Sequence, residues 1–160
     1  MSVSVMPHFS ADIASRSVDT DDVVGLDVPM TLHIESVSVD TTDPARIAPF
    51  WEAALGWARS VHSDDDEIVL VAPDGTAPEL LFLRVPEGKT VKNRLHLDLR
   101  PADDQQGEVT RLESLGARRV DVGQTDSVPW IVMADPDGNE FCVLSVKKAV
   151  AELGVVVAPS

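Results

Sequence analysis

The sequence reads IVLVAPDG at residues 68–75 and, with little change, IVMADPDG at residues 131–138. Each copy follows a helix-like stretch that ends in Leu-Gly, and each is followed by another apolar strand. The order strand, helix, strand, turn, strand therefore runs over about residues 31–86 and again over about 93–146. A unit that recurs as a pair, rather than as a long array, is typical of a duplication with pseudo-symmetry. Two half-sheets related in this way can enclose one shared cleft.

The composition limits the classes of function. A chain of 160 residues with 44% hydrophobic residues is long enough for one domain with a real core. Its formal net charge of −14 argues against nucleic acid and anionic membranes as partners, because both require a basic surface. A single cysteine, Cys142, excludes an internal disulfide and fits a reducing compartment. No secretory signal or transmembrane run is recognisable, so we expect a cytoplasmic protein.

Two segments lie outside the repeat. Residues 1–30 are acidic and predict a weakly ordered arm, and residues 147–160 form a short C-terminal tail. Inside the repeat, Asp43-Pro44 is a strong helix start, and Gly56 predicts where that helix ends. In the second unit, Asp103 with Gln106 resembles a capping box.

The strand expected around residue 96 is the most polarised in the chain. Three leucines alternate along it with charged residues, so one face is apolar and the other is a ladder of Arg94, His96, Asp98 and Arg100. The leucines, at positions 95, 97 and 99, are predicted to cover the helices. The ladder then faces either solvent or the cleft, and the pattern alone leaves both open.

Several motifs together carry a resemblance to a known family. FWEAALGW follows the Asp-Pro helix start, RLHLDL opens the second half, and DPDGNEFCVL lies near its end. In combination these motifs resemble the vicinal-oxygen-chelate superfamily, and within it the glyoxalase-like domains common in actinobacterial genomes. The resemblance implies an α+β fold of two tandem βαβββ modules forming a curved mixed sheet around a cleft. It also implies that the polar ladder faces this cleft and that the chain forms a homodimer.

The resemblance also locates the positions of a metal centre. Metal-dependent members place one ligand on the first and one on the last strand of each module, usually His or Gln with Glu. The matching positions here are Ser36, Leu81, His96 and Cys142. Leucine cannot bind a metal and serine is a poor ligand, while a catalytic site needs three protein ligands. Asp98 and Glu140 are expected to lie roughly 6–7 Å along their strands from these positions. We therefore expect no divalent metal at the family's position, and no other cofactor.

Two pairs of side chains are candidates for catalysis. Cys142 and His96 could form a thiolate–imidazolium pair across the cleft, although a free cysteine is usually a small buried apolar residue. His96 and Asp98 could serve acid–base chemistry, although neighbours on one strand face more often form a structural charge ladder. Trp57 and Trp130 lie at loop–strand junctions and are predicted to line the cleft mouth, whereas Trp51 is predicted to belong to the core.

The favoured functional hypothesis is a metal-independent protein that holds a small organic ligand between the modules, as bleomycin-resistance-type relatives do. Its predicted ligand contacts are Ser36, Ser38, Trp57, Leu81, Arg94, Asp98, Trp130 and Glu140. The alternative is a lyase or isomerase acting on a small carbonyl or hydroxy compound, with or without a divalent metal. In that case His96 would act as base and Cys142 or Glu140 would assist. A pure dimerisation module is disfavoured, because it would not need a charged cleft.

Overall fold

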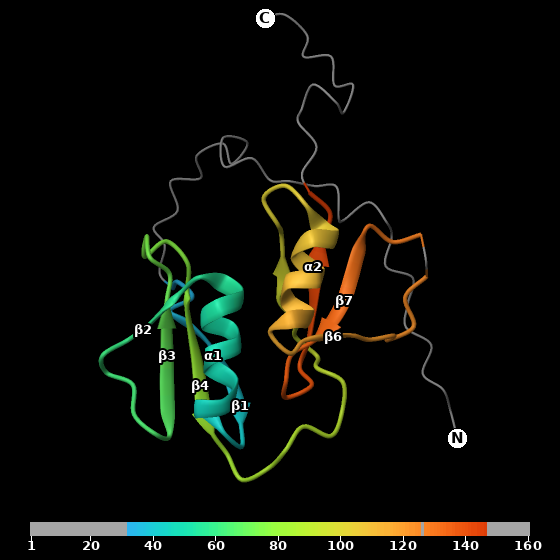
Figure 1. The fold of residues 1–160 in the computed structure, drawn as a ribbon. Helices are drawn as coiled ribbons and strands as arrows, with labels where there is room; N and C mark the ends of the chain where they lie inside the picture. The colour runs from blue at the N-terminus through green and yellow to red at the C-terminus, as the bar shows by residue number, and fades with distance from the viewer. Residues whose placement is uncertain (1–31, 126, 147–160) are drawn as a thin grey trace, which may run out of the picture.

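A computed structural model describes residues 32–125 and 127–146, and the proposed N-terminal arm and C-terminal tail lie outside these residues. Within the described part, the chain forms two helices and two four-stranded mixed sheets, as the sequence predicts for an α+β fold. The sheets lie side by side with their helices in front (Figure 1). No described helix has the length and apolar character needed to cross a membrane.

The two modules repeat one topology. The first comprises β1 (Ser36–Thr41), α1 (Pro44–Leu55), β2 (Ala58–Arg59), β3 (Glu67–Val71) and β4 (Glu79–Arg84). The second comprises β5 (Asp98–Leu99), α2 (Gln105–Ser114), β6 (Arg118–Arg119), β7 (Trp130–Ala134) and β8 (Glu140–Leu144). The strand orders are β1-β4-β3-β2 and β5-β8-β7-β6, and in each sheet the first strand pairs in parallel with the last. The predicted βαβββ duplication is therefore confirmed.

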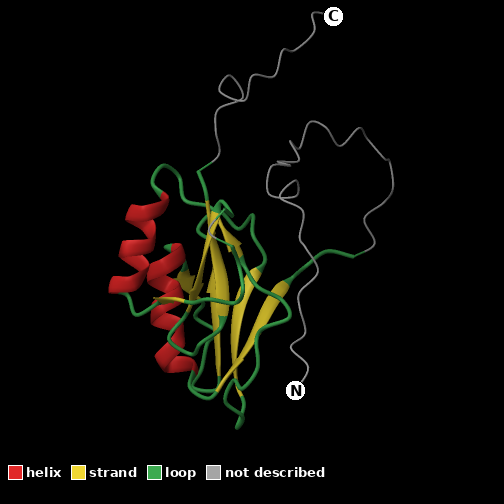
Figure 2. Cartoon of the chain, turned by 90° about the vertical axis from the view of Figure 1, so that its right-hand side faces the viewer, coloured by secondary structure: helices red, strands yellow, loops and turns green. Residues whose placement is uncertain are grey.

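The core lies between the helices and one face of the sheets. Both helices cover the same side of the strands (Figure 2). Because side chains alternate along a strand, every second residue points at these helices. The fully buried members include Ile47 of α1, Leu112 of α2, and Phe82, Met133 and Phe141 of the strands. The opposite face of the sheets is mixed, since Ser38 and Asp98 share it with apolar residues such as Leu81 and Val132.

Local signals explain where the helices begin and end. Asp43 caps α1 by accepting a hydrogen bond from the backbone N–H of Arg46, and Gly56 ends the helix with a φ of 66°. Helix α2 is capped by Asp104, which accepts from the backbone N–H of Gln106 at 3.0 Å. The predicted capping box at Asp103 is therefore wrong by one position.

The strand expected from residue 93 onward is much shorter than its pattern predicts. Only Asp98 and Leu99 form β5, and Leu95 is 72% exposed instead of covering the helices. The parallel register pairs Asp98 with Cys142, and β8 begins only two residues earlier, at Glu140. Among residues 32–125 and 127–146, those before 96 consequently have no neighbouring strand to bond, and their alternation builds no sheet. Leu97 and Leu99 do pack against the core.

Helix α1 is held at both ends by the second module. Near its start, Arg46 forms an ion pair with Asp137, and Thr41 donates its hydroxyl to the same carboxylate. At its end, Arg111 of α2 donates to the carbonyl oxygens of Ala53 and Ala54 at 2.9 and 2.8 Å. These contacts fix the angle at which the two modules meet.

A buried carboxylate completes this contact. Asp135 is 1% exposed and accepts hydrogen bonds from the backbone N–H groups of Asp137 and Asn139 and from the Asn139 amide. Its fourth donor is the indole N–H of Trp51 in the first module, at 3.1 Å. Burial raises the pKa of Asp135, and the surrounding N–H donors act in the opposite direction. The second Pro-Asp-Gly turn is thus also the joint between the modules.

Candidate functional site

A cleft of about 650 Å³ lies where the two modules meet. One side is β1, and the other is the connection formed by residues 85–97, which joins the modules. The start of β8 and the indole of Trp51 also contribute to its lining. In the part of the chain that the structure describes, β1 is the edge strand of its sheet and residues before 96 pair with no strand, so no strand fills the space between them. The cleft therefore follows from the short β5.

The lining combines apolar and polar groups from both modules. Val37, Val39, Leu97 and Phe141 supply apolar surface, and all four are buried or half-buried. Charged and polar side chains also line it, namely Asp40, Glu87, Lys89, Lys92, Asn93, Arg94, His96 and Glu140. A concave site that mixes apolar walls with a few polar groups is the usual form of a small-molecule pocket.

Glu140 fixes the connection to the second sheet. Its carboxylate accepts from the ammonium of Lys89 at 3.1 Å and from the backbone N–H of Asn93 at 2.9 Å. Burial acts to raise its pKa, but these two partners outweigh burial and the pKa of Glu140 is lowered. The sequence predicted Glu140 as a ligand contact, yet its bonds also give it a structural role that no sequence pattern indicated.

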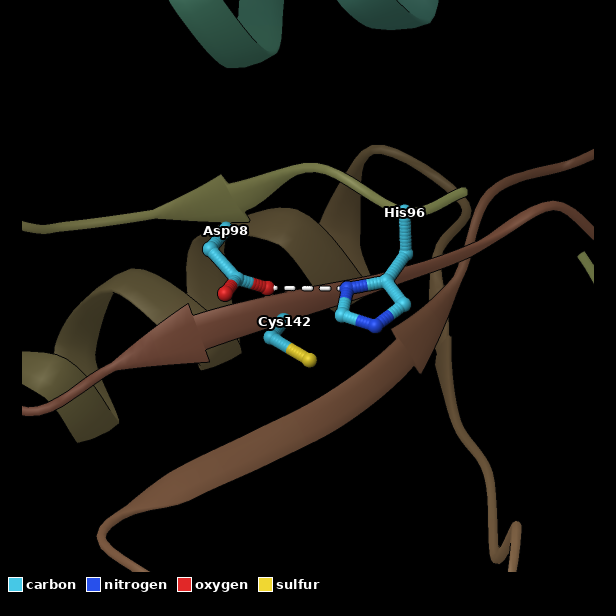
Figure 3. Close-up of side chains that lie close together, drawn as sticks. All are labelled: His96, Asp98 and Cys142. Carbon is cyan, nitrogen blue, oxygen red and sulfur yellow. Dashed lines mark hydrogen bonds and ion pairs between the residues drawn. The ribbon is translucent and has the colours of Figure 1, made fainter. Parts of the chain in front are cut away.

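His96, just before β5, lies together with Asp98 of β5 and Cys142 of β8 (Figure 3). His96 Nδ1 and Asp98 Oδ1 form a hydrogen bond of 3.0 Å, and one donor atom from each of the three residues lies within 4.8 Å of the others. The imidazole and carboxylate are 43% and 51% exposed, whereas Cys142 is 7% exposed. Burial, with the charge of Asp98 beside it, raises the pKa of the Cys142 thiol to about 12. In the absence of a metal, this thiol is protonated at neutral pH.

The remaining predicted contacts are divided between the cleft and other places. The cleft is lined by Ser38, Arg94, His96 and Glu140 among the predicted residues, and also by Trp51. The other predicted contacts, Ser36, Trp57, Leu81, Asp98 and Trp130, are not among its lining residues. Trp51 has both roles, since it is also 4% exposed and packs against Phe50 and Phe141. In the sequence, Trp51 lies on the apolar face of a predicted helix, and this pattern predicted a core residue but not a cleft residue.

The metal centre that the resemblance implies does not fit this chain. It would draw ligands from both modules, but Ser36 and Leu81 offer at most one weak oxygen donor. Among the described residues, the single cluster of three or more His, Cys, Asp or Glu donors is His96, Asp98 and Cys142. All three belong to the second module. Any metal that binds here would use a different set of ligands.

Comparison with solved structures finds the same fold. A possible glyoxalase from Bacillus cereus matches with a TM-score of 0.55 and 17% identity, over 71% of this chain and 98% of that one. A glyoxalase/bleomycin resistance/dioxygenase family enzyme from Burkholderia phytofirmans matches with a TM-score of 0.57 and 16% identity, over 72% and 100%. The fosfomycin resistance protein FosX from Listeria monocytogenes, in complex with Mn(II) and 1S,2S-dihydroxypropylphosphonic acid, gives 0.58 and 12%, over 74% and 93%. At these identities the likeness establishes the fold.

Comparison of the sequence with known families and proteins identifies the family. No curated protein matches the chain. The model of the family described as the glyoxalase-like domain matches residues 36–144, which run from the first residue of β1 to the last residue of β8. The match therefore covers both βαβββ modules, the cleft between them and the His96, Asp98 and Cys142 cluster. The chain belongs to the glyoxalase-like domain family, within the glyoxalase/bleomycin resistance/dioxygenase (vicinal-oxygen-chelate) fold.

Proposed function

We propose that the protein binds a small organic ligand in the cleft between β1 and residues 85–97, without a metal at the family's four positions. The observation that carries this proposal is the cleft of about 650 Å³ whose apolar walls and charged side chains come from both modules. That volume lies within the usual range of about 300–1,000 Å³ for ligand pockets. Ser36 and Leu81 support the second part of the proposal, since neither is a useful metal ligand.

Ligand binding can be tested without knowing the ligand. We expect members of a library of small carbonyl, hydroxy and aromatic compounds to raise the melting temperature of the protein in the presence of a chelator. Ser38→Trp should abolish this shift, because Ser38 lines the cleft and a large side chain there fills it. Ser36→Trp is the matched control, since Ser36 lies two residues away on the same strand but outside the lining. Equal loss in both variants, or a shift that survives Ser38→Trp, would contradict the proposal.

A second candidate is a lyase or isomerase that uses His96 as general base. It is favoured by the hydrogen bond between His96 and Asp98, which can orient an imidazole that lines the cleft. His96→Gln separates the two functions. An enzyme should lose turnover by more than about a hundredfold while ligand affinity changes little. Loss of affinity, with no turnover detected in the native protein, would favour simple binding.

The assembly and location of the protein belong to the same proposal. The family resemblance supports a homodimer, and the single cysteine supports the cytoplasm. Light scattering during size-exclusion chromatography gives the oligomeric state directly. A monomer at micromolar concentration would contradict the dimer and leave the ligand-binding proposal intact, because both sides of the cleft come from one chain.

A further inference from the structure

The cluster of His96, Asp98 and Cys142 brings together an imidazole nitrogen, a carboxylate oxygen and a sulfur atom. We propose that these three side chains bind a divalent metal ion of the zinc class, in a site built entirely within the second module. The site shares the second-module positions His96 and Cys142 with the family's centre, but its ligand set differs, because it takes no donor from the first module and adds Asp98. It does not rest on the proposed ligand binding, although His96 also lines the cleft.

The backbone determines this arrangement. His96 lies two residues before Asp98, and the hydrogen bond of 3.0 Å between their side chains places both on the same side of the chain. The sheet register places Cys142 directly opposite Asp98 on the adjacent strand β8, about 4.8 Å away. Zinc bonds of about 2.0–2.3 Å in a tetrahedral site require donor atoms about 3.5 Å apart. The donors already lie within 4.8 Å of one another, so small side-chain rotations bring them into range. The two exposed side chains, His96 and Asp98, are free to make these rotations.

The chemistry of the donors selects the class of ion. One nitrogen, one oxygen and one sulfur donor suit Zn²⁺ or Co²⁺, whereas Mg²⁺ and Ca²⁺ require oxygen ligands. On binding, the metal displaces the proton of the Cys142 thiol. The resulting thiolate and the Asp98 carboxylate together carry two negative charges, which balance a divalent cation.

The site leaves one coordination position open. Three protein ligands with a free fourth position is the usual arrangement of a catalytic zinc site, whereas structural sites are closed by four. Here the partly exposed His96 and Asp98 leave the metal accessible, and His96 also lines the cleft. A metal at this place would therefore stand at the edge of the cleft.

Titration with Co²⁺ after removal of metals by a chelator tests the proposal in the full-length protein. We expect one Co²⁺ per chain and a thiolate-to-cobalt charge-transfer band in the near ultraviolet, which Zn²⁺ abolishes by displacement and Mg²⁺ does not. Asp98→Asn and His96→Gln should each weaken Co²⁺ binding by more than about tenfold, since even the loss of an outer-sphere partner costs 10–100-fold. Cys142→Ser should eliminate the band.

The chain contains a matched control for these variants. His33 and Glu35 form a pair of the same spacing, with His33 Nε2 2.7 Å from Glu35 Oε2, but no cysteine belongs to it. His33→Gln and Glu35→Gln should leave Co²⁺ stoichiometry and affinity unchanged. Because Asp98 is exposed, Asp98→Asn is expected to fold normally, and circular dichroism verifies this. Absence of the charge-transfer band in the native protein, unchanged affinity in folded Asp98→Asn, or equal loss in His33→Gln would overturn the proposal.

Discussion

At the scale of single residues, the joint between the modules depends on a difference between the two repeats. The sequences IVLVAPDG and IVMADPDG differ chiefly at Ala72 and Asp135. Asp135 is buried and accepts four N–H groups, one of them from Trp51 in the other module. The repeat alone indicates two equivalent turns, because a carboxylate in such a turn is ordinary turn chemistry. The position where the copies differ is the one that joins them.

Asp135→Ala should lower the free energy of unfolding by about 3 kcal/mol, because it leaves buried N–H donors, including the Trp51 indole, without partners. Urea denaturation followed by circular dichroism measures this loss. Asp74→Ala is the control, since Asp74 lies in the exposed turn of the first repeat and accepts a hydrogen bond from the neighbouring backbone N–H of Thr76 rather than from the other module. Its cost should stay within about 0.5 kcal/mol. Similar costs for the two substitutions would show that Asp135 is not the joint.

The cluster on the second sheet was predictable in part. The alternation along residues 94–100 identified His96 and Asp98, and the resemblance identified Cys142. The expected separation of roughly 6–7 Å between the side chains at positions 96 and 98 assumes that they extend in parallel from a strand. In the structure these side chains turn toward one another, and their donor atoms and that of Cys142 lie within 4.8 Å. Rotamer choice depends on neighbouring strands, which the sequence of one segment does not contain.

At the scale of elements, periodicity located both helices and the longer strands but overestimated the strands that border the cleft. Residues 32–35 and 93–97 alternate as strands do, yet they lie outside β1 and β5. An alternating pattern becomes a strand only where a partner offers backbone hydrogen bonds, and β8 begins too late to provide them before residue 96. The cleft is therefore a feature that local sequence could not predict.

Glu140 should determine how firmly the connection of residues 85–97 is held. Glu140→Gln removes the ion pair with Lys89 and weakens the hydrogen bond from Asn93. We expect trypsin to cleave the variant several-fold faster after Lys89, Lys92 or Arg94, as mass spectrometry of early fragments would show. Glu79→Gln is the matched control, because Glu79 opens β4 as Glu140 opens β8. Equal rates for the native protein and Glu140→Gln would exclude this anchoring role.

The same contact should respond to acid. The pKa of Glu140 in the folded protein lies below its ordinary value of 4.5. A carboxylate with a lowered pKa stabilises the fold at pH values above the unfolded pKa, and this contribution is lost as the pH falls through the folded one. Cleavage of the connection by an acid-stable protease should therefore accelerate in the native protein as the pH falls below 4.5 and through the lowered pKa of Glu140. Glu140→Gln should lack this pH dependence, and a parallel rise in both proteins would assign the effect to other carboxylates.

At the scale of the whole molecule, helix α1 of the first module links that module to the second. The first module contributes α1, and the second holds it near its start through Asp137 and at its end through Arg111. The aromatic rings of Trp51 and Phe141 also meet across this joint, with centroids 5.3 Å apart. Since the cleft lies between the same two modules, any change that loosens the joint should also change the cleft. The duplication in the sequence predicted the pair of modules, but not the residues that fix their relative position.

Arg111→Ala should therefore destabilise both modules, although the residue belongs to the second. Its guanidinium satisfies the carbonyl oxygens of Ala53 and Ala54, which are otherwise free at the end of α1, and removing it should cost about 1–2 kcal/mol. Hydrogen exchange should show protection falling by the same factor in β3 and β4 as in β7 and β8. Arg119→Ala is the control, because Arg119 pairs with Glu113 inside the second module, and an exposed pair contributes less than about 1 kcal/mol. A loss of protection in Arg111→Ala that is confined to the second module would contradict this prediction. It would show that the two modules unfold independently.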